Sequence, residues 1–157
     1  AQAMRLPHHV LRVHSPFDQS YEDGLRELRD KHDVNCVITG DIDEVEGYPN
    51  WVRQRAAAVG MPVLTPLWGR DRRDLLELTL ARGFEVIFSC VKQPWLDHTW
   101  LGRTITPEAI EELKSVSQRT GLDLCGENGE YHTLVLAGPV FSQRISLRWQ
   151  MAHSGDG

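Results

Sequence analysis

Short β-branched runs alternate with capped amphipathic segments through the first ninety residues, and this alternation constrains the fold more than any other feature. The expected strands cover 8–13, 34–39, 62–67 and 84–91, with a helix expected in each interval. They recur roughly every 25 residues, close to the length of a strand–helix crossover unit. Because such crossovers are right-handed and return to a parallel strand, the pattern predicts an α/β fold with helices on both faces of a parallel sheet.

Capping residues predict where the helices begin. Ser20, Asn50, Asp71 and Thr106 each precede a segment with helical apolar spacing, and Pro107 follows the last of these caps. The first helix is expected to bury a stripe at spacing i, i+4, i+7, and three of the helices are expected to end at a glycine. The stripe comprises Tyr21, Leu25 and Leu28, and the glycines are Gly60, Gly83 and Gly121.

The last third of the chain changes character. It contains one expected helix from 106, a long polar loop, and expected strands at 133–137 and 144–149. We therefore expect two parts, a nucleotide-binding-type α/β part at 1–92 and a smaller α+β substrate part at 93–157.

Composition excludes several classes of protein. The net charge of −5 argues against general nucleic-acid binding, which needs a basic surface. No apolar run approaches the length of a membrane span, and the first residues lack the apolar core of a secretion signal. The cysteines Cys36, Cys90 and Cys125 show no paired spacing, which favours a reducing cytoplasm over a disulfide framework.

Distinctive side chains follow the expected strands. In open α/β sheets, ligands collect at the carboxyl ends of the strands. Here those ends carry Gly40-Asp41, Trp68, Arg70 and Lys92, which we expect to share one rim. The alternative for each residue is a simple turn or a solvated charge. No glycine-rich phosphate-binding motif is present.

The segment CGENGEYHT (125–133) concentrates unusual chemistry in nine positions. Its two glycines permit backbone conformations closed to other residues, so that two carboxylates, a phenol and an imidazole can point inward. A plain polar turn is the simplest alternative. A zinc site at Glu127, Glu130 and His132 lacks a known ligand spacing, and a Cys125 nucleophile with His132 as base lacks an orienting group. We assign no metal.

The sequence GENGEYHT followed by GPVF (138–141) resembles the signature of the diphthine–ammonia ligase family, among the PP-loop ATP pyrophosphatases of the adenine nucleotide alpha hydrolase-like superfamily. The resemblance covers nearly all of 1–145, and the other segments follow the family's order along the chain. These are Gln2-Ala3 with Leu6-Pro7, Tyr21-Glu22 through Leu28, Thr39-Gly40-Asp41-Ile42, Asn50-Trp51-Val52-Arg53, Pro66-Leu67-Trp68, Gly83-Phe84 and Trp100-Leu101-Gly102-Arg103.

This resemblance implies a Rossmann-like, HUP-type sheet and an ATP-dependent amide ligase. ATP, with Mg²⁺, would adenylate a carboxylate such as that of diphthine on elongation factor two. Pyrophosphate would then leave, and ammonia would displace AMP. The family's SGGKDS phosphate loop is absent, so the sheet is expected to be incomplete at the N-terminus and the chain alone to bind ATP poorly.

The resemblance also implies roles for the loop and the rim. As catalytic residues, Glu127 and Glu130 would either offset the trimethylammonium charge of diphthine or hold an incoming ammonium ion, and His132 would remove a proton from ammonium to make the nucleophile. The expected substrate-binding residues are Gly126, Asn128, Gly129, Tyr131, Trp68 and Trp100. The aromatic faces of Tyr131, Trp68 and Trp100 would attract a quaternary ammonium group. The expected nucleotide-binding residues are Gly40 and Asp41.

Two other functional classes compete with the ligase. One is a non-catalytic binding module that keeps the pocket for a small cation or nucleoside without phosphate binding. The other is a metal-dependent hydrolase built on the acidic loop. A second copy of the chain is included among the candidate partners.

Overall fold

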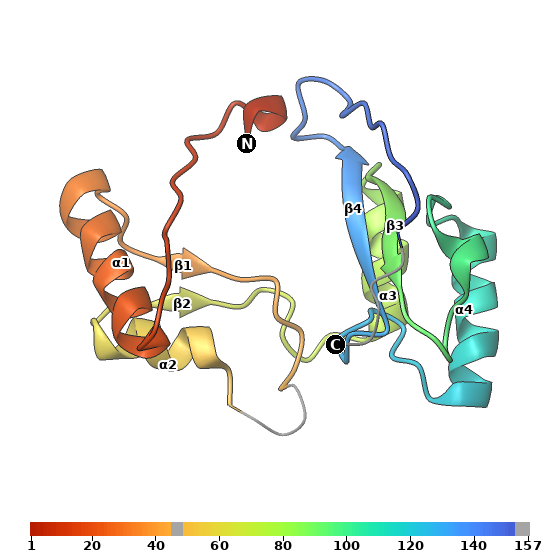
Figure 1. Ribbon diagram of the computed structural model, residues 1–157, viewed down its shortest axis with the longest axis horizontal. Helices are drawn as coiled ribbons and strands as arrows, with labels where there is room; N and C mark the ends of the chain where they lie inside the picture. Colours follow the sequence, from red (N-terminus) through yellow and green to blue (C-terminus); the bar gives the residue numbers. More distant parts are fainter. Residues whose placement is uncertain (45–48, 153–157) are drawn as a thin grey trace.

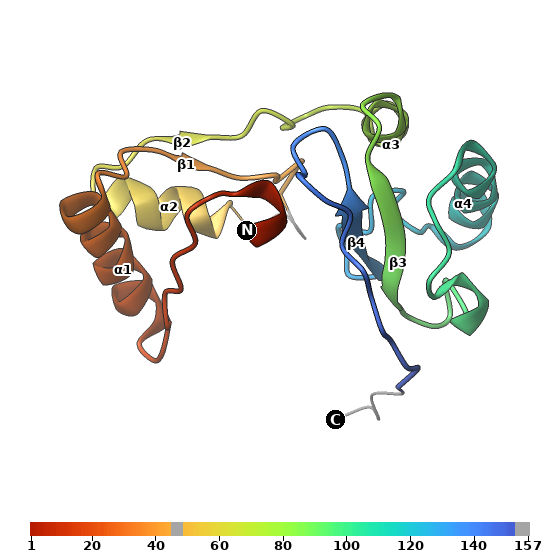
Figure 2. The same ribbon diagram turned by 90° about the horizontal axis from the view of Figure 1, so that it is seen from above.

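The computed structural model describes residues 1–44 and 49–152. Its elements form two groups, one containing α1, β1, α2 and β2 and the other containing α3, β3, α4 and β4 (Figure 1). The segment between β2 and α3 connects the two groups. Figure 2 shows the same division from above. The coarse prediction of an α/β protein is confirmed.

The first group pairs two short parallel strands. It comprises α1 (Phe17–His32), β1 (Val37–Ile38), α2 (Trp51–Ala58) and β2 (Val63–Leu64). In the ladder, Val37 lies opposite Val63 and Ile38 opposite Leu64. A small core of Leu25, Ala56, Val59 and Met61 packs beside these strands.

The second group holds the larger core. It comprises α3 (Arg72–Ala81), β3 (Glu85–Val91), the 3-10 turn η2 (His98–Trp100), α4 (Pro107–Thr120) and β4 (Tyr131–Ala137). Strands β3 and β4 are antiparallel, so the end of β3 lies beside the start of β4, where Val91 pairs with Tyr131. Phe88, Ile110 and Leu113 are fully buried at the centre of this group.

The predicted continuation of the parallel sheet into 84–91 is wrong. β3 is a strand, as expected, but it belongs to a separate antiparallel sheet. Both of its edges are occupied, by β4 on one side and by 102–105 on the other, where Phe88 N–H donates to the Arg103 carbonyl and Ile105 N–H to the Val86 carbonyl. No edge is left for β2.

Two other expected strands are absent from the described residues. Segment 8–13 is extended but packs its Leu11 side chain onto Gly24 of α1, where an added Cβ would lie 2.9 Å from Leu11 Cδ1. Segment 144–149 makes one ladder-like bond, from Ile145 N–H to the Leu136 carbonyl, and then leaves β4. Without continuous backbone partners, neither segment forms a strand.

Most predicted helix boundaries are confirmed. Asn50, Asp71 and Thr106 cap their helices through side-chain oxygens, and Gly121 ends α4 in a left-handed conformation. The cap at Ser20 is wrong, because α1 begins at Phe17 and the Ser20 hydroxyl bonds the His14 imidazole instead.

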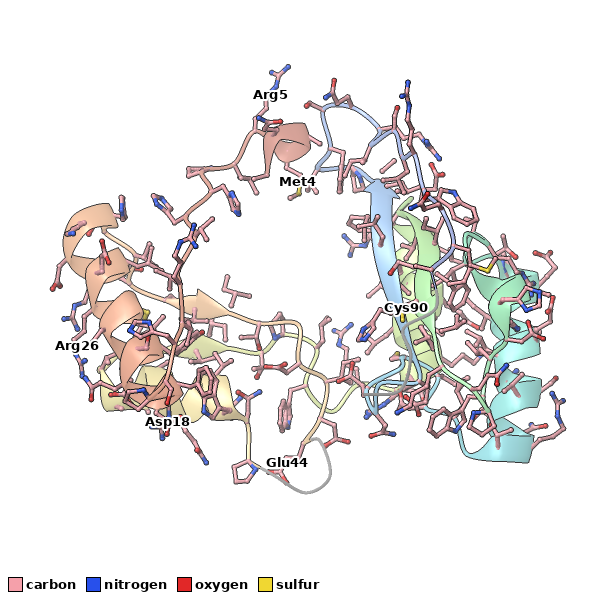
Figure 3. All side chains as sticks on the ribbon, viewed as in Figure 1. Met4, Arg5, Asp18, Arg26, Glu44 and Cys90 are labelled. Atoms are coloured by element: carbon pink, nitrogen blue, oxygen red, sulfur yellow. The ribbon has the colours of Figure 1, made fainter. Side chains whose placement is uncertain are left out.

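The N-terminal 3-10 turn η1 (Gln2–Met4) contacts the turn after β4. The backbone N–H of Ser142 and its hydroxyl both donate to the Ala3 carbonyl, at 2.6 and 2.8 Å. Figure 3 labels Met4 and Arg5 in and after this turn. None of the helices within the described residues is long and apolar enough to cross a membrane.

Candidate functional site

Three loop segments meet where the two groups of elements join. These segments, which we call the junction, are 39–43 after β1, 65–72 from the end of β2 to the first residue of α3, and 123–130 before β4. The backbone N–H of Gly69 donates to the Ile42 carbonyl at 2.8 Å, which links the first two segments. The Arg72 guanidinium lies 3.2 Å from Asp123 and 3.4 Å from Asp43, which links the third segment to both others.

Glu130 orders the GENGEYHT loop from inside. It is 1% exposed, and its carboxylate accepts the N–H of Asp123 at 2.8 Å, the N–H of Asn128 at 3.1 Å and the Asn128 side-chain amide at 3.4 Å. A buried carboxylate with hydrogen-bond donors on both oxygens is stable, because the bonds offset its desolvation. In this structure Glu130 therefore holds the loop together and does not face an open rim.

Asp123 organises the start of the same loop. Its carboxylate accepts the N–H of Cys125 at 2.8 Å and that of Glu127 at 3.5 Å, in the manner of an Asx turn. Its second oxygen lies near Arg72 Nε. The backbone N–H of Lys92 donates to the Glu130 carbonyl at 2.9 Å, so the end of β3 anchors the other end of the loop.

Gly126 and Tyr131 fit against each other. Gly126 has a φ of 73°, and a Cβ there would lie 2.9 Å from the Tyr131 carbonyl oxygen, so only glycine fits without distortion. Tyr131 is buried against Phe88, and its hydroxyl donates to the Leu124 carbonyl. Burial raises the pKa of Tyr131, so the phenol stays protonated and holds the loop from beneath.

Glu127 is the carboxylate that the loop presents outward. It is half-buried, and its carboxylate accepts no hydrogen bond from the described residues. Partial burial, followed by the charge of Asp123, raises the pKa of Glu127 above its ordinary value, while Arg72 opposes the shift. Asp41 and Asp43 lie on the segment 39–43 after β1, which we call the β1 rim, and they also raise this pKa. The negative charge of the β1 rim therefore acts on the carboxylate that the loop presents. A carboxylate in this environment suits cation binding or proton transfer.

On the β1 side, Asp41 is fixed by two neighbours. One of its oxygens accepts from the Thr39 hydroxyl and from the Asn50 side-chain amide, both at 2.6 Å. Since Asn50 also caps α2, these bonds tie the rim to that helix. Gly40 precedes Asp41, is exposed, and has open space where a Cβ would lie.

The two predicted aromatic residues lie in different environments. Trp68 is half-buried on the segment after β2, with the Arg53 guanidinium 5.2 Å from its ring centroid. Trp100 is 7% exposed in the larger core, edge-on to Phe88 and stacked with Arg103. The structure therefore brings Trp68 to the junction but places Trp100 in the packing of the second group.

The remaining predicted residues are more exposed. His132 follows the loop on β4, opposite Cys90 of β3. Asn128 is exposed at the tip of the loop, and Gly129 has a φ of 81° there with open space around it. Lys92 places its ammonium over Trp95, and Arg70 is exposed at the end of its turn.

The structure disfavours a nucleophilic role for Cys125. Burial raises the pKa of this thiol to about 12, and its Sγ lies 3.5 Å from the Arg72 carbonyl. A thiol with so high a pKa supplies little thiolate at neutral pH. Among the described residues, no three His, Cys, Asp or Glu side chains are arranged to hold a metal ion.

Sequence reasoning missed three members of the junction, namely Asp43, Arg72 and Asp123. A usable signal existed for Arg72, because a cation in the first turn of a helix opposes the helix dipole and calls for a local acidic partner. Asp123 stands just before a glycine-rich turn, a position typical of carboxylates that bond the following backbone.

Residues 71–154 match the family described as the diphthamide synthase C-terminal domain. The chain is also similar to curated proteins named diphthine–ammonia ligase. The one from Schizosaccharomyces pombe is 32% identical over 123 residues, which cover 78% of this chain and 20% of that protein. The one from Rattus norvegicus is 31% identical over 136 residues, 84% of this chain and 50% of that protein. The human protein is 29% identical, with 77% and 45% covered. The chain thus spans half or less of the length of these relatives.

Proposed function

Since the chain belongs to the diphthamide synthase C-terminal domain family, we propose that it forms the acceptor and ammonia side of an ATP-dependent amide ligase. In this reaction a substrate carboxylate is activated with ATP, pyrophosphate is released, and ammonia replaces AMP to give the amide. The curated relatives named diphthine–ammonia ligase support diphthine as the carboxylate.

The observation that carries this proposal is the half-buried Glu127 carboxylate with its raised pKa. Ammonium is the predominant form at neutral pH, but only the deprotonated form, ammonia, attacks an acyl group. Glu127 binds the ammonium and takes its proton, and the raised pKa brings the carboxylate closer to ammonium in proton affinity. His132, exposed two residues beyond the buried Glu130, accepts a proton that leaves the loop.

The substrate lies between the loop and the β1 rim in this proposal. The half-buried ring of Trp68 offers a face for a trimethylammonium group. The glycines and Asn128 of the loop supply backbone groups and an amide near the substrate. Trp100 contributes only indirectly, through the core beneath Tyr131.

ATP and Mg²⁺ fit the β1 side in part. Asp41 is held by Thr39 and Asn50 through one oxygen, and the described residues leave its other oxygen free for a ribose hydroxyl or a cation. Gly40 leaves the backbone beside it open. The 157 residues contain no phosphate loop, so binding of the phosphates requires another part of the ligase.

We also propose that β1 and β2 belong to a larger Rossmann-like, HUP-type sheet. Their parallel pairing supports this assignment, as do the exposed side chains of Ile38 and Leu64, which lie opposite each other on adjacent strands. The three cysteines are free thiols, which supports a reducing cytoplasmic location.

The test is an assay of the whole protein with ATP, ammonium and diphthine-containing elongation factor two, scored by AMP formation and amide product. Loss of a general base costs about 10²–10⁴ in rate, so Glu127→Gln should reduce amide formation by that factor. Glu108→Gln, an exposed acid at the start of α4, is the matched control. Full activity of the Glu127→Gln variant would exclude this role.

The absence of a phosphate loop from these residues favours one second candidate, a non-catalytic module that binds a nucleoside or small cation. In that case the protein would bind ligand in calorimetry but release no AMP with any carboxylate. AMP formation that depends on ammonium and on Glu127 would reject this candidate.

A further inference from the structure

Arg72 occupies a distinctive position in the junction. Its guanidinium lies between Asp123, which opens the GENGEYHT loop, and Asp43, which follows the β1 rim. Its backbone carbonyl contacts the Cys125 thiol of the same loop. One residue at the first position of α3 therefore touches both sides of the site proposed above.

Among residues 1–44 and 49–152, few other contacts fix these two sides relative to each other. The Gly69 bond to Ile42 ties the rim to the segment before α3 but does not reach the loop. Beside the junction lies a cavity of about 370 Å³ with mostly apolar walls, which include Ile42, Leu75 and Cys125. Where packing leaves such a cavity, van der Waals contacts fix the separation weakly and polar contacts set it.

The three charged groups differ in burial, and only one of the two Arg72 contacts is sheltered from water. Arg72 and Asp123 side chains are 24% and 17% exposed, whereas Asp43 is 56% exposed. The Asp123 contact is thus the more sheltered one and anchors the guanidinium to the loop. The Asp43 contact is the more exposed one and reaches across to the rim.

We propose that Arg72 is a positioning residue, which holds the Asp43 segment against the Asp123 loop and so sets the distance between the β1 rim and Glu127. The expected effect of Arg72 on catalysis rests on the proposed ligase function. The mechanical link itself is a property of the fold and is testable without substrate.

Cys125 provides a built-in reporter of the link. Its thiol is shielded beneath the Arg72 backbone, whereas Cys90 is exposed on β3, at the place labelled in Figure 3. Alkylation of the whole protein by iodoacetamide, followed by peptide mass spectrometry, gives the rate at Cys125 relative to that at Cys90. Release of the loop would uncover the Cys125 thiol and relieve the burial that raises its pKa, so more of the thiol would be thiolate. Loss of the Arg72 charge, which lowers this pKa, opposes that gain in Arg72→Gln but not in Asp43→Asn.

Asp43→Asn should raise the relative alkylation rate of Cys125 several-fold, the scale expected for a partly exposed ion pair, and Arg72→Gln should also raise it, with little added in the double variant. The matched control is Arg73→Gln, because Arg73 bonds Glu77 and Glu111 and reaches neither loop. Unchanged Cys125 protection in both Asp43→Asn and Arg72→Gln would overturn the link. Asp43→Asn removes an exposed group and is not expected to unfold the protein.

The catalytic consequence is measured separately in the ligase assay. Arg72→Gln should raise the KM for ammonium with a smaller effect on the KM for ATP, because Glu127 is displaced. If Cys125 is released but ammonium kinetics are unchanged, the positioning role is overturned while the ligase proposal stands. If no variant or wild-type protein forms amide, the ligase proposal fails and the alkylation result still decides the link.

Discussion

The backbone N–H of Asp123 donates to the buried Glu130 carboxylate at 2.8 Å, and this bond closes the loop that presents Glu127. The other Glu130 oxygen accepts the N–H of Asn128. Glu130→Gln would keep one acceptor oxygen and place an NH₂ group against the other donor. One buried loop N–H would then lose its partner, so we expect a loss of about 1–3 kcal/mol in the free energy of unfolding, measured by urea denaturation.

Glu127→Gln is the matched control for this variant, since it makes the same chemical change three residues earlier in the same loop. The Glu127 carboxylate accepts no bond from the described residues, so its neutralisation should not lower the urea midpoint. Equal destabilisation by the two substitutions would contradict the role that we assign to Glu130.

Glu127 should also give stability a characteristic pH dependence. Its pKa is raised in the folded state, first by burial and then by Asp123, so the folded protein holds this proton more tightly than the unfolded chain. The raised pKa therefore lowers the free energy of unfolding in a pH-dependent way. This loss is absent below the ordinary pKa near 4.5, grows as pH rises through the raised pKa of the folded state, and is constant at higher pH. Relative to wild type, Glu127→Gln should therefore gain stability between about pH 4 and neutrality.

The measurement is the difference in urea midpoint between the two proteins at several pH values. Carboxylates with arginine or lysine partners, such as Glu85 and Glu112, have lowered pKa values and give the opposite slope in both proteins. Their contributions cancel in the difference. A midpoint difference that does not change with pH would show that the environment of Glu127 is not as described.

The two loop glycines should differ in their tolerance of alanine. Both have positive φ, which costs a residue with a Cβ about 1–2 kcal/mol. At Gly129 the Cβ meets open space, so Gly129→Ala should lose about that amount. At Gly126 the Cβ would also press on the Tyr131 backbone, so Gly126→Ala should lose distinctly more. Thermal unfolding of the two variants side by side measures the difference, and equal losses would contradict the contact.

Local chemistry explains which parts of the fold were predictable. The caps at Asn50, Asp71 and Thr106 depend on residues within three positions, and each forms as the sequence indicates. Strand pairing depends on distant partners. The apolar run at 84–91 correctly predicts a strand, but its composition cannot show that β4 and the 102–105 segment occupy both edges.

The candidate site was predictable in its location more than in its roles. The density of polar groups in 125–133 correctly marked a structured loop, and Asp41 does lie at the end of its strand. Burial divides the loop residues, however, since Glu130 and Tyr131 turn inward while Glu127 faces the junction. Arg72 and Asp123 were missed because their pairing spans about fifty residues of sequence and appears only once α3 packs near the loop.

The contrast between Trp100 and Trp68 gives a final prediction. Trp100 packs edge-on to Phe88 in the larger core, and Trp→Ala at such a site costs about 3–5 kcal/mol. Trp68→Ala should cost much less, about 1 kcal/mol, because its ring is half-buried and its main partner is the exposed Arg53. In the ligase assay, Trp68→Ala should therefore raise the KM for the carboxylate substrate in a folded protein. Trp100→Ala should instead lower the urea midpoint and the fraction of folded protein. A well-folded Trp100→Ala variant with a raised substrate KM would show that Trp100, despite its burial, contacts the substrate.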